Sequence, residues 1–295
     1  MLDSSVSDGN TIVLPDGRKL GYSDWGPLNG KVVLFFPGIP CSRFFRFGSK
    51  ELLEELNVRM FVLERPGYGL SDIKANRNIL DWAADVNDFL EILDIEKANI
   101  VGYSGGGPFA LACTYTLFER INNTAIVSGC DPHFQYEVFI NHSEKIKEFA
   151  SLVKSDPKAA LRIAMDLSIN PKKITEELIG AASLRDQEIF SYPEINSMFL
   201  ANFIEGTRSN LLGFEYAHEL LLLFKPWNFP YDEINKEIHL WYGMHDKNEF
   251  HSPTHGQYLS GKLPNSKLHL YEDEGTSILW AKSREILQSV LNNVI

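Results

Sequence analysis

The 295-residue sequence has little cysteine, no long hydrophobic run and fewer basic than acidic side chains. Its three cysteines, Cys41, Cys113 and Cys130, are odd in number and far apart. They argue against a disulfide framework or a zinc site and fit a reducing cytoplasm, where we expect the protein to act. No segment approaches the roughly 18 apolar residues of a membrane-spanning helix, and the first residues do not resemble a secretory signal.

The net charge of −11 bears on the possible partners. It would repel nucleic-acid phosphates and anionic membrane surfaces. We therefore expect a small-molecule substrate, no nucleic acid, no membrane, and neither a cofactor nor a metal ion. The oligomeric state stays open.

Short apolar runs alternate with helical patterns along most of the chain, which predicts a doubly wound α/β sheet with right-handed crossovers. A Pro-Asp-Gly turn at 15–17 predicts an N-terminal hairpin, with one short strand on each side of the turn. The expected later strands are 31–36, 58–63, 98–103, 124–128, 237–242 and 267–271. The expected helices of this part are 42–56, 79–94, 108–118, 252–262 and 277–293.

Residues 102–106 read Gly-Tyr-Ser-Gly-Gly, a Gly-x-Ser-x-Gly pattern between an apolar strand and an amphipathic helix. A serine at such a strand-to-helix turn stands exposed above the sheet, where its Oγ can attack an acyl carbon. The glycines allow the chain to turn tightly. The pattern predicts Ser104 as a nucleophile; the alternative is a purely structural turn.

Further motifs strengthen this interpretation and occur at 35–43 (Phe-Phe-Pro-Gly-Ile-Pro-Cys-Ser-Arg), 64–72 (Glu-Arg-Pro-Gly-Tyr-Gly-Leu-Ser-Asp), 226–229 and 240–246. With the serine motif, they resemble the α/β-hydrolase superfamily in order and spacing. The resemblance is to its capped members, which include esterases, epoxide hydrolases, haloperoxidase-like enzymes and proline iminopeptidases. It covers roughly residues 18–132 and 220–292.

The resemblance implies an eight-stranded, mostly parallel sheet with an inserted helical cap. We expect the core at 1–132 and 229–295 and the cap at 133–228, where the strand–helix alternation stops and aromatic residues gather. Any single aromatic residue could simply pack the cap on the core, but as a group they favour an apolar pocket roof. The run 220–224 predicts a buried last helix of the cap.

One family residue is missing from its usual place. Family members have Gly-His after the last strand, and that histidine is the general base; here the pair is Gly275-Thr276. Asp246 occupies the position of the family's acid, and Asp131 lies at the alternative acid position of some relatives. The sequence thus presents a nucleophile and an acid, but Thr276 stands at the position of the expected histidine.

Another histidine could supply the base. His251 and His255 follow the acid loop and could approach the same edge of the sheet, whereas His239 and His269 fall inside strands. We expect surface or capping roles to be commoner than catalysis for any one of the eight, which are His133, His142, His218, His239, His245, His251, His255 and His269.

The resemblance also implies an oxyanion hole formed by the backbone N–H groups of Gly105 and Ile39. Pro40 has no N–H to offer. Pro37 replaces the family's supporting histidine in this loop, so the brace for the loop must differ.

Two functions remain open at this stage. The first is a serine hydrolase that acts on a small, largely apolar ester-like substrate through Ser104. The second is a catalytically impaired or inactive homologue that binds a small molecule. An unrelated binding protein of flavodoxin type would require the order of the motifs to be a coincidence.

Overall fold

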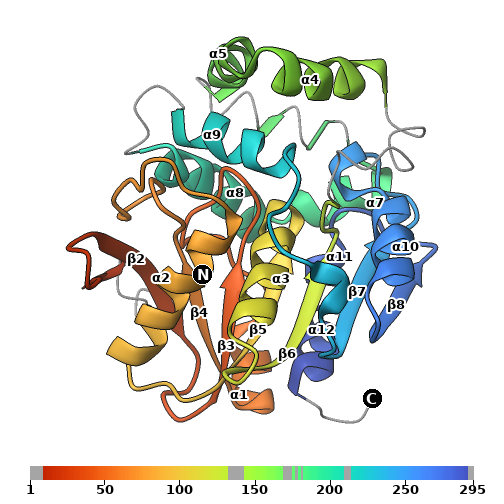
Figure 1. The fold of residues 1–295 in the computed structure, drawn as a ribbon. Coiled ribbons are helices and arrows are strands. Elements are labelled where there is room, and N and C mark those ends of the chain that lie inside the picture. The colour runs from red at the N-terminus through yellow and green to blue at the C-terminus, as the bar shows by residue number, and fades with distance from the viewer. Residues whose placement is uncertain are drawn as a thin grey trace.

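A single sheet forms the centre of the computed structural model, which describes residues 9–131, 143–168, 175–176, 179–180, 182–208 and 214–291 (Figure 1). Its strand order is β1-β2-β4-β3-β5-β6-β7-β8. The strands are β1 (Asn10–Val13), β2 (Lys19–Trp25), β3 (Lys31–Phe36), β4 (Val58–Leu63), β5 (Ala98–Tyr103), β6 (Ile121–Val127), β7 (Ile238–Gly243) and β8 (Ser266–Tyr271). β1 and β2 form an antiparallel hairpin, β2 pairs antiparallel with β4, and the remaining pairs are parallel. The predicted eight-stranded, mostly parallel sheet is confirmed.

Helices cover both faces of the sheet, as the doubly wound pattern predicts. The helices of this layer are α1 (Lys50–Leu56), α2 (Ile79–Ile92), α3 (Gly107–Thr116), α10 (Pro253–Lys262), α11 (Ile278–Ala281) and α12 (Ser283–Leu291). Buried side chains of α2, α3 and α10 join one apolar cluster with the sheet, and those of α1, α11 and α12 join another. The sheet therefore has an apolar core on each side.

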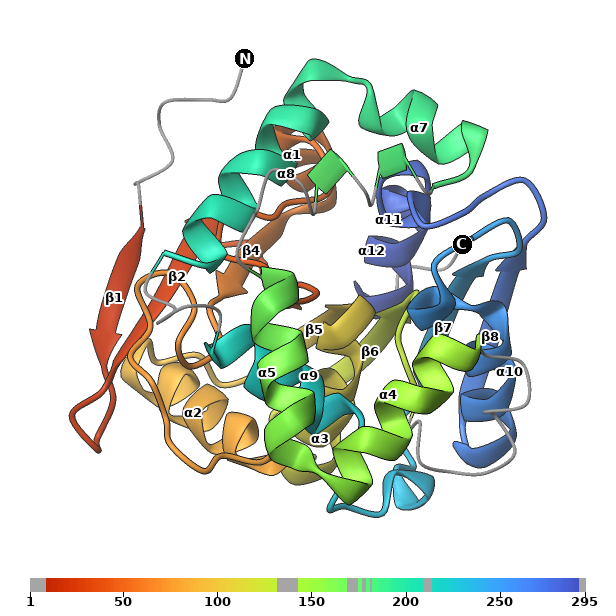
Figure 2. The ribbon, with the colours of Figure 1, turned by 90° about the horizontal axis from the view of Figure 1, so that it is seen from above.

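The helices between β6 and β7 lie over one end of the sheet (Figure 1). They are α4 (Glu144–Ser155), α5 (Pro157–Ser168), α7 (Leu184–Phe190), α8 (Pro193–Gly206) and α9 (Phe214–Leu223). Seen from above, α7 and α8 lie on one side and α4, α5 and α9 on the other (Figure 2). The predicted apolar run at 220–224 is buried in α9 and just after it. The boundaries of the cap stay predictions, and Phe134, Tyr136 and Phe139 of its expected aromatic set lie outside the described residues.

Two predicted helices differ from the structure. The helix expected at 42–56 begins only at Lys50, because Gly48 has a φ of +73° and the Ser49 side chain accepts the amide of Leu52 as an N-cap. The helix expected at 277–293 is divided into α11 and α12 at Lys282, whose φ of −117° is not helical. The spacing of apolar residues does not predict where a cap or a non-helical residue interrupts a helix.

Two features bear on membrane and metal binding. None of the helices in the described ranges has the length and apolar content needed to cross a bilayer. Nor do the described residues bring three His, Cys, Asp or Glu side chains together in a group that could hold a metal ion.

The turn from β5 into α3 leaves no room for a side chain at Gly106. A Cβ atom there would overlap the carbonyl oxygen of Phe36 on the neighbouring strand β3. The tight turn is therefore a steric requirement of packing between β3 and α3, apart from any chemistry at Ser104.

We expect Gly106→Ala to lower the free energy of unfolding by roughly 1–3 kcal/mol or more, because backbone must move to admit the methyl group. Gly261→Ala in α10 is the matched control, since a Cβ atom there meets nothing within 4 Å. It should raise stability by up to about 1 kcal/mol through the unfolded chain. Urea unfolding measures both; equal effects of the two variants would contradict the steric account.

Candidate active site

The candidate site lies where loops from four parallel strands meet. Ser104 follows β5, Asp246 and His251 follow β7, Thr276 follows β8, and Gly38 and Ile39 follow β3. Because parallel strands end at the same edge, these loops converge there, which is the usual place for ligands in such sheets. A cavity of about 440 Å³ is lined by residues of all four loops and of the helices above them.

The backbone of Ser104 is strained. Its φ is +51°, a left-handed conformation that costs energy for a residue with a side chain. The helical segment Ser104–Gly106 and then α3 begin at this turn. The serine is thus held at the amino end of a helix, with its side chain among the cavity-lining residues.

The hydroxyl of Ser104 contacts an imidazole. His251 Nε2 lies 2.7 Å from Ser104 Oγ, and the histidine is 6% exposed. In the neutral imidazole one nitrogen carries a proton and the other accepts one. With Nε2 as the acceptor from the serine hydroxyl, Nδ1 must carry the proton.

Two acceptors face Nδ1 of His251. Thr276 Oγ1 lies 2.6 Å from it and Asp246 Oδ2 lies 3.3 Å from it. The Tyr103 hydroxyl lies 3.1 Å from both the Thr276 carbonyl oxygen and Oγ1. If the tyrosine donates to the carbonyl, Thr276 can donate to the tyrosine oxygen, and Oγ1 is then free to accept from Nδ1. Burial raises the pKa of Tyr103, so its phenol keeps its proton.

Local hydrogen bonds hold His251 in a fixed turn, Glu249–His251. Asp246 Oδ1 accepts the amide of Asn248, and the Asn248 side chain accepts the amide of Phe250. Ser252 then caps α10. Asp246, Asn248 and Ser252 each accept a nearby backbone amide. These hydrogen bonds shape the loop so that the imidazole of His251 reaches Ser104.

A second buried pair supports the same turn. His255 Nε2 lies 2.7 Å from the Glu249 carbonyl oxygen, to which it can only donate. His255 Nδ1 lies 2.9 Å from Asp131 Oδ2, and both side chains are fully buried. Asp131, the alternative acid of the sequence analysis, thus pairs with His255, and Asp246 lies beside His251.

The predicted oxyanion residues lie next to the serine. A Cβ atom built on Gly38 would lie 3.3 Å from Ser104 Oγ, and one built on Gly105 would lie 3.3 Å from the Ile39 side chain. Gly38 and Ile39 line the same cavity as Ser104. The geometry therefore brings Ser104, Asp246, Ile39, Gly105 and Thr276 together, and their roles in catalysis stay predictions.

The expectation of a surface or capping role is wrong for His251, whose buried ring contacts Ser104. His239 and His269 lie in adjacent strands, as expected, 3.0 Å apart between Nδ1 and Nε2. His133 and His142 lie outside the described residues. The sequence signal for His251 is weak: the cap-forming residues Asn248 and Ser252 flank it in the loop after Asp246, but they do not indicate that its ring reaches Ser104.

The cavity is mostly apolar. Ile39, Phe45 and Tyr103 of the core face residues of the helices above, which are Ile146, Ile179, Ala182, Phe190, Phe199, Phe203 and Tyr216. Within the described part of the chain, the charged lining consists of Lys247, Asp246 and Glu249, all from the loop after β7. The charged groups thus lie together at one side of an otherwise apolar space.

Residues 31–150 match the family model of the alpha/beta hydrolase fold. A non-heme chloroperoxidase from Streptomyces lividans is 32% identical over 124 residues, which are 41% of this chain and 45% of the chloroperoxidase. A 2-hydroxy-6-oxononadienedioate/2-hydroxy-6-oxononatrienedioate hydrolase from Escherichia coli is 24% identical over 286 residues, which are 93% of this chain and 90% of that enzyme. The chain spans less than half of the chloroperoxidase and nearly all of the hydrolase.

Solved structures share the fold. An esterase from Exiguobacterium antarcticum superposes with a TM-score of 0.66 at 18% identity, over 96% of this chain and 98% of the esterase. A bromoperoxidase from Bacillus anthracis gives 0.66 at 19% identity, over 97% and 98%.

Residues 31–150 match the α/β-hydrolase family, and the chain as a whole has the α/β-hydrolase fold. This confirms the family and the fold class that the motifs indicated. The match to the family and the enzymes named among the relatives also support the expectation of an α/β-hydrolase-type hydrolase. The imidazole that contacts Ser104 comes from the loop after β7, and Thr276 lies after β8, at the position where the resemblance places a histidine.

We expect neutral His251 to carry its proton on Nδ1, because Thr276 Oγ1 and Asp246 Oδ2 both face that nitrogen. NMR of ¹⁵N-labelled histidine should show this tautomer, with a downfield Nδ1 proton that reflects the short bond to Thr276. Thr276→Val should move this resonance, whereas Thr116→Val, at an exposed position, should not. A predominant Nε2–H tautomer in the wild-type protein would contradict the assignment.

Proposed function

We propose that the protein is a serine hydrolase of small, largely apolar ester-like substrates, with Ser104 as the nucleophile and His251 as the general base. The observation that carries the proposal is the 2.7 Å contact between Ser104 Oγ and His251 Nε2. A serine hydroxyl is a weak nucleophile until a neighbouring base removes its proton. The contact supplies that base from a position that the sequence motif does not mark.

The reaction follows from this arrangement. His251 Nε2 takes the proton of Ser104 as Oγ attacks the ester carbon, and the carbonyl oxygen becomes an oxyanion. The N–H groups of Gly105 and Ile39 would stabilise that charge. The resulting imidazolium gives its proton to the leaving alkoxide, which departs as the alcohol. The same imidazole then deprotonates a water molecule, which attacks the acyl carbon of the acyl-enzyme. The bond to Ser104 Oγ breaks, the imidazolium returns the proton to Oγ, and the carboxylic acid is released.

Asp246 and Thr276 have different tasks in this scheme. Thr276 Oγ1, at 2.6 Å, fixes the tautomer and the orientation of the ring through a neutral hydrogen bond. Asp246 Oδ2, at 3.3 Å, provides the negative charge that stabilises the imidazolium. Thr276 thus orients the proposed base, although it occupies the position where the family has its catalytic histidine.

The cavity supports the choice of substrate. Its volume of about 440 Å³ suits a small molecule, and most of its lining side chains are apolar or aromatic. Among the described residues that line the cavity, Lys247 is the one cation, and the carboxylates of Asp246 and Glu249 lie beside it, so this part of the lining does not favour a dianion. We therefore propose neutral esters with short apolar acyl groups, and not the dioate named for the Escherichia coli relative.

The remaining parts of the proposal concern organisation and location. We propose residues 133–228 as the cap and 1–132 with 229–295 as the core, because the helices over the cavity come from the former segment. We propose the cytoplasm as the location, since all three cysteines are free thiols in the structure. The alternative is a binding protein without turnover. The contact between Ser104 and an imidazole favours the hydrolase over it, because binding alone does not require such a contact.

We expect His251→Ala to lower kcat for an activated short-chain ester by roughly 10³-fold or more, because the proton of Ser104 then has only water to accept it. Ser104→Ala should cost about as much, and the double variant no more than either, since the two residues act as a unit. His245→Ala, an exposed histidine next to Asp246, is the control and should retain wild-type turnover.

Purified variants are compared by steady-state kinetics after circular dichroism has established that each is folded. Retention of turnover within tenfold in folded His251→Ala would rule out the proposed base. A wild-type protein that binds esters in the cavity without Ser104-dependent turnover would favour the binding protein instead.

A further inference from the structure

We propose that Arg65 is a positioning residue that sets the orientation of the oxyanion loop, and that Glu219 of α9 holds Arg65 in place. The kinetic part of this inference rests on the proposed function; the structural part does not. Arg65 belongs to the Glu-Arg-Pro-Gly motif after β4, to which the reaction scheme above assigns no task.

Arg65 donates to two successive carbonyl groups of the loop after β3. Its Nη1 lies 2.7 Å from the Pro37 oxygen and its Nη2 lies 2.9 Å from the Gly38 oxygen. The Gly38 carbonyl and the Ile39 N–H belong to one planar peptide unit and, in the trans form, point in opposite directions. By fixing the carbonyl on one side, Arg65 fixes on the other the N–H group that would face the oxyanion.

This brace replaces one that the sequence lacks. The resemblance to the superfamily places a supporting histidine where this chain has Pro37. Proline has no imidazole to donate, but its carbonyl can accept from a side chain that comes from the neighbouring strand. Arg65 lies in the loop after β4. Because β4 pairs in parallel with β3, this loop leaves the same edge of the sheet as the oxyanion loop after β3, and the Arg65 side chain can reach that loop.

Arg65 needs a counter-charge because it is only 1% exposed. Its Nε and Nη2 lie 2.8 Å from the two carboxylate oxygens of Glu219, a bidentate pair. Burial works to raise the pKa of Glu219, but Arg65 and Arg77 outweigh it, so this pKa lies below its usual value and the carboxylate is charged. A buried guanidinium without this partner would be strongly unfavourable.

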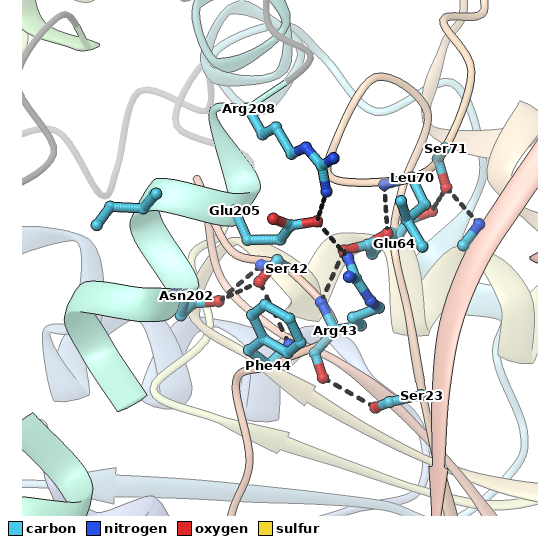
Figure 3. A network of polar contacts seen from close by, with 12 residues as sticks. Ser23, Ser42, Arg43, Phe44, Glu64, Leu70, Ser71, Asn202, Glu205 and Arg208 are labelled. Carbon is cyan, nitrogen blue, oxygen red and sulfur yellow. Dashed lines mark hydrogen bonds and ion pairs between the residues drawn. The ribbon is translucent and has the colours of Figure 1, made fainter. Parts of the chain in front are cut away.

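The pair joins the oxyanion loop to the helices above the site, since Glu219 lies on α9. The other end of the loop is joined to α8 in a similar way (Figure 3). Arg43 Nη1 lies 2.8 Å from Glu64 and 2.7 Å from Glu205 of α8, and the Ser42 amide donates to Asn202 of the same helix. The loop is therefore joined at both ends to helices of the proposed cap.

Arg77 offers a matched control. It is also buried, and its Nη2 lies 3.2 Å from Glu219, 3.5 Å from Glu215 and 3.4 Å from the Pro66 carbonyl oxygen. Arg77→Met therefore removes the same charge from the same cluster, but it removes no donor from the carbonyls of Pro37 and Gly38.

Two measurements test the inference on the full-length protein. The first is amide hydrogen exchange of the peptide that contains 37–43, by mass spectrometry. Arg65→Met should speed exchange in this peptide at least tenfold, and Arg77→Met should leave it within about threefold. The second is steady-state hydrolysis of an activated ester. Loss of oxyanion stabilisation lowers kcat by about 10²-fold or more, so Arg65→Met should do so with KM within about threefold, whereas Arg77→Met should not.

Glu219→Gln and Arg65→Lys keep the test available if Arg65→Met does not fold. Glu219→Gln keeps an acceptor for Arg65 and should have a smaller effect of the same kind; Arg65→Lys, which can donate to the carbonyls without a bidentate pair, should recover part of kcat. Equal effects of folded Arg65→Met and Arg77→Met on exchange and on kcat, or none for Arg65→Met, would overturn the inference. If the wild-type chain shows no Ser104-dependent turnover, the proposed function fails and the exchange comparison alone decides the role of Arg65.

Discussion

The contact between the Ser104 hydroxyl and the His251 imidazole is the interaction on which the proposed chemistry of this site depends. It joins loops that leave β5 and β7, two strands separated in the sheet by β6. For the ring to cover that distance, the loop after β7 must turn back over the sheet. The hydrogen bonds of Asp246, Asn248 and His255 provide this turn, and all three are at least partly buried.

Much of the fold follows from the sequence because its signals are local. Continuous apolar runs predicted β3, β4 and β5 at the bounds that the structure shows, and the glycines of the Gly-x-Ser-x-Gly pattern predicted the turn at Ser104. The start of α1 was not predicted, since a cap at Ser49 and a left-handed Gly48 outweigh apolar spacing. The motifs at 35–43, 64–72, 102–106 and 240–246 lie at or just after the ends of β3, β4, β5 and β7, at one edge of the sheet.

The base could not be predicted in the same way. The motif after β8 marks the family position of the histidine, and a threonine there indicates only what is absent. Whether one of eight histidines fills the place depends on distances between loops that lie far apart in the sequence. His251 and Thr276 are 25 positions apart, yet their side chains are in hydrogen-bond contact. In the proposed site that contact gives the threonine a task, since its Oγ1 is an acceptor for Nδ1 of His251.

The most direct test of His251 as the base is the rate at which an alkyl fluorophosphonate phosphonylates the protein, followed by intact mass and mapped by peptide sequencing. The account predicts one label, on Ser104, and a rate at least about 10²-fold lower in His251→Gln, because attack by the hydroxyl requires a general base. An unchanged rate in folded His251→Gln, or a label on a residue other than Ser104, would contradict it.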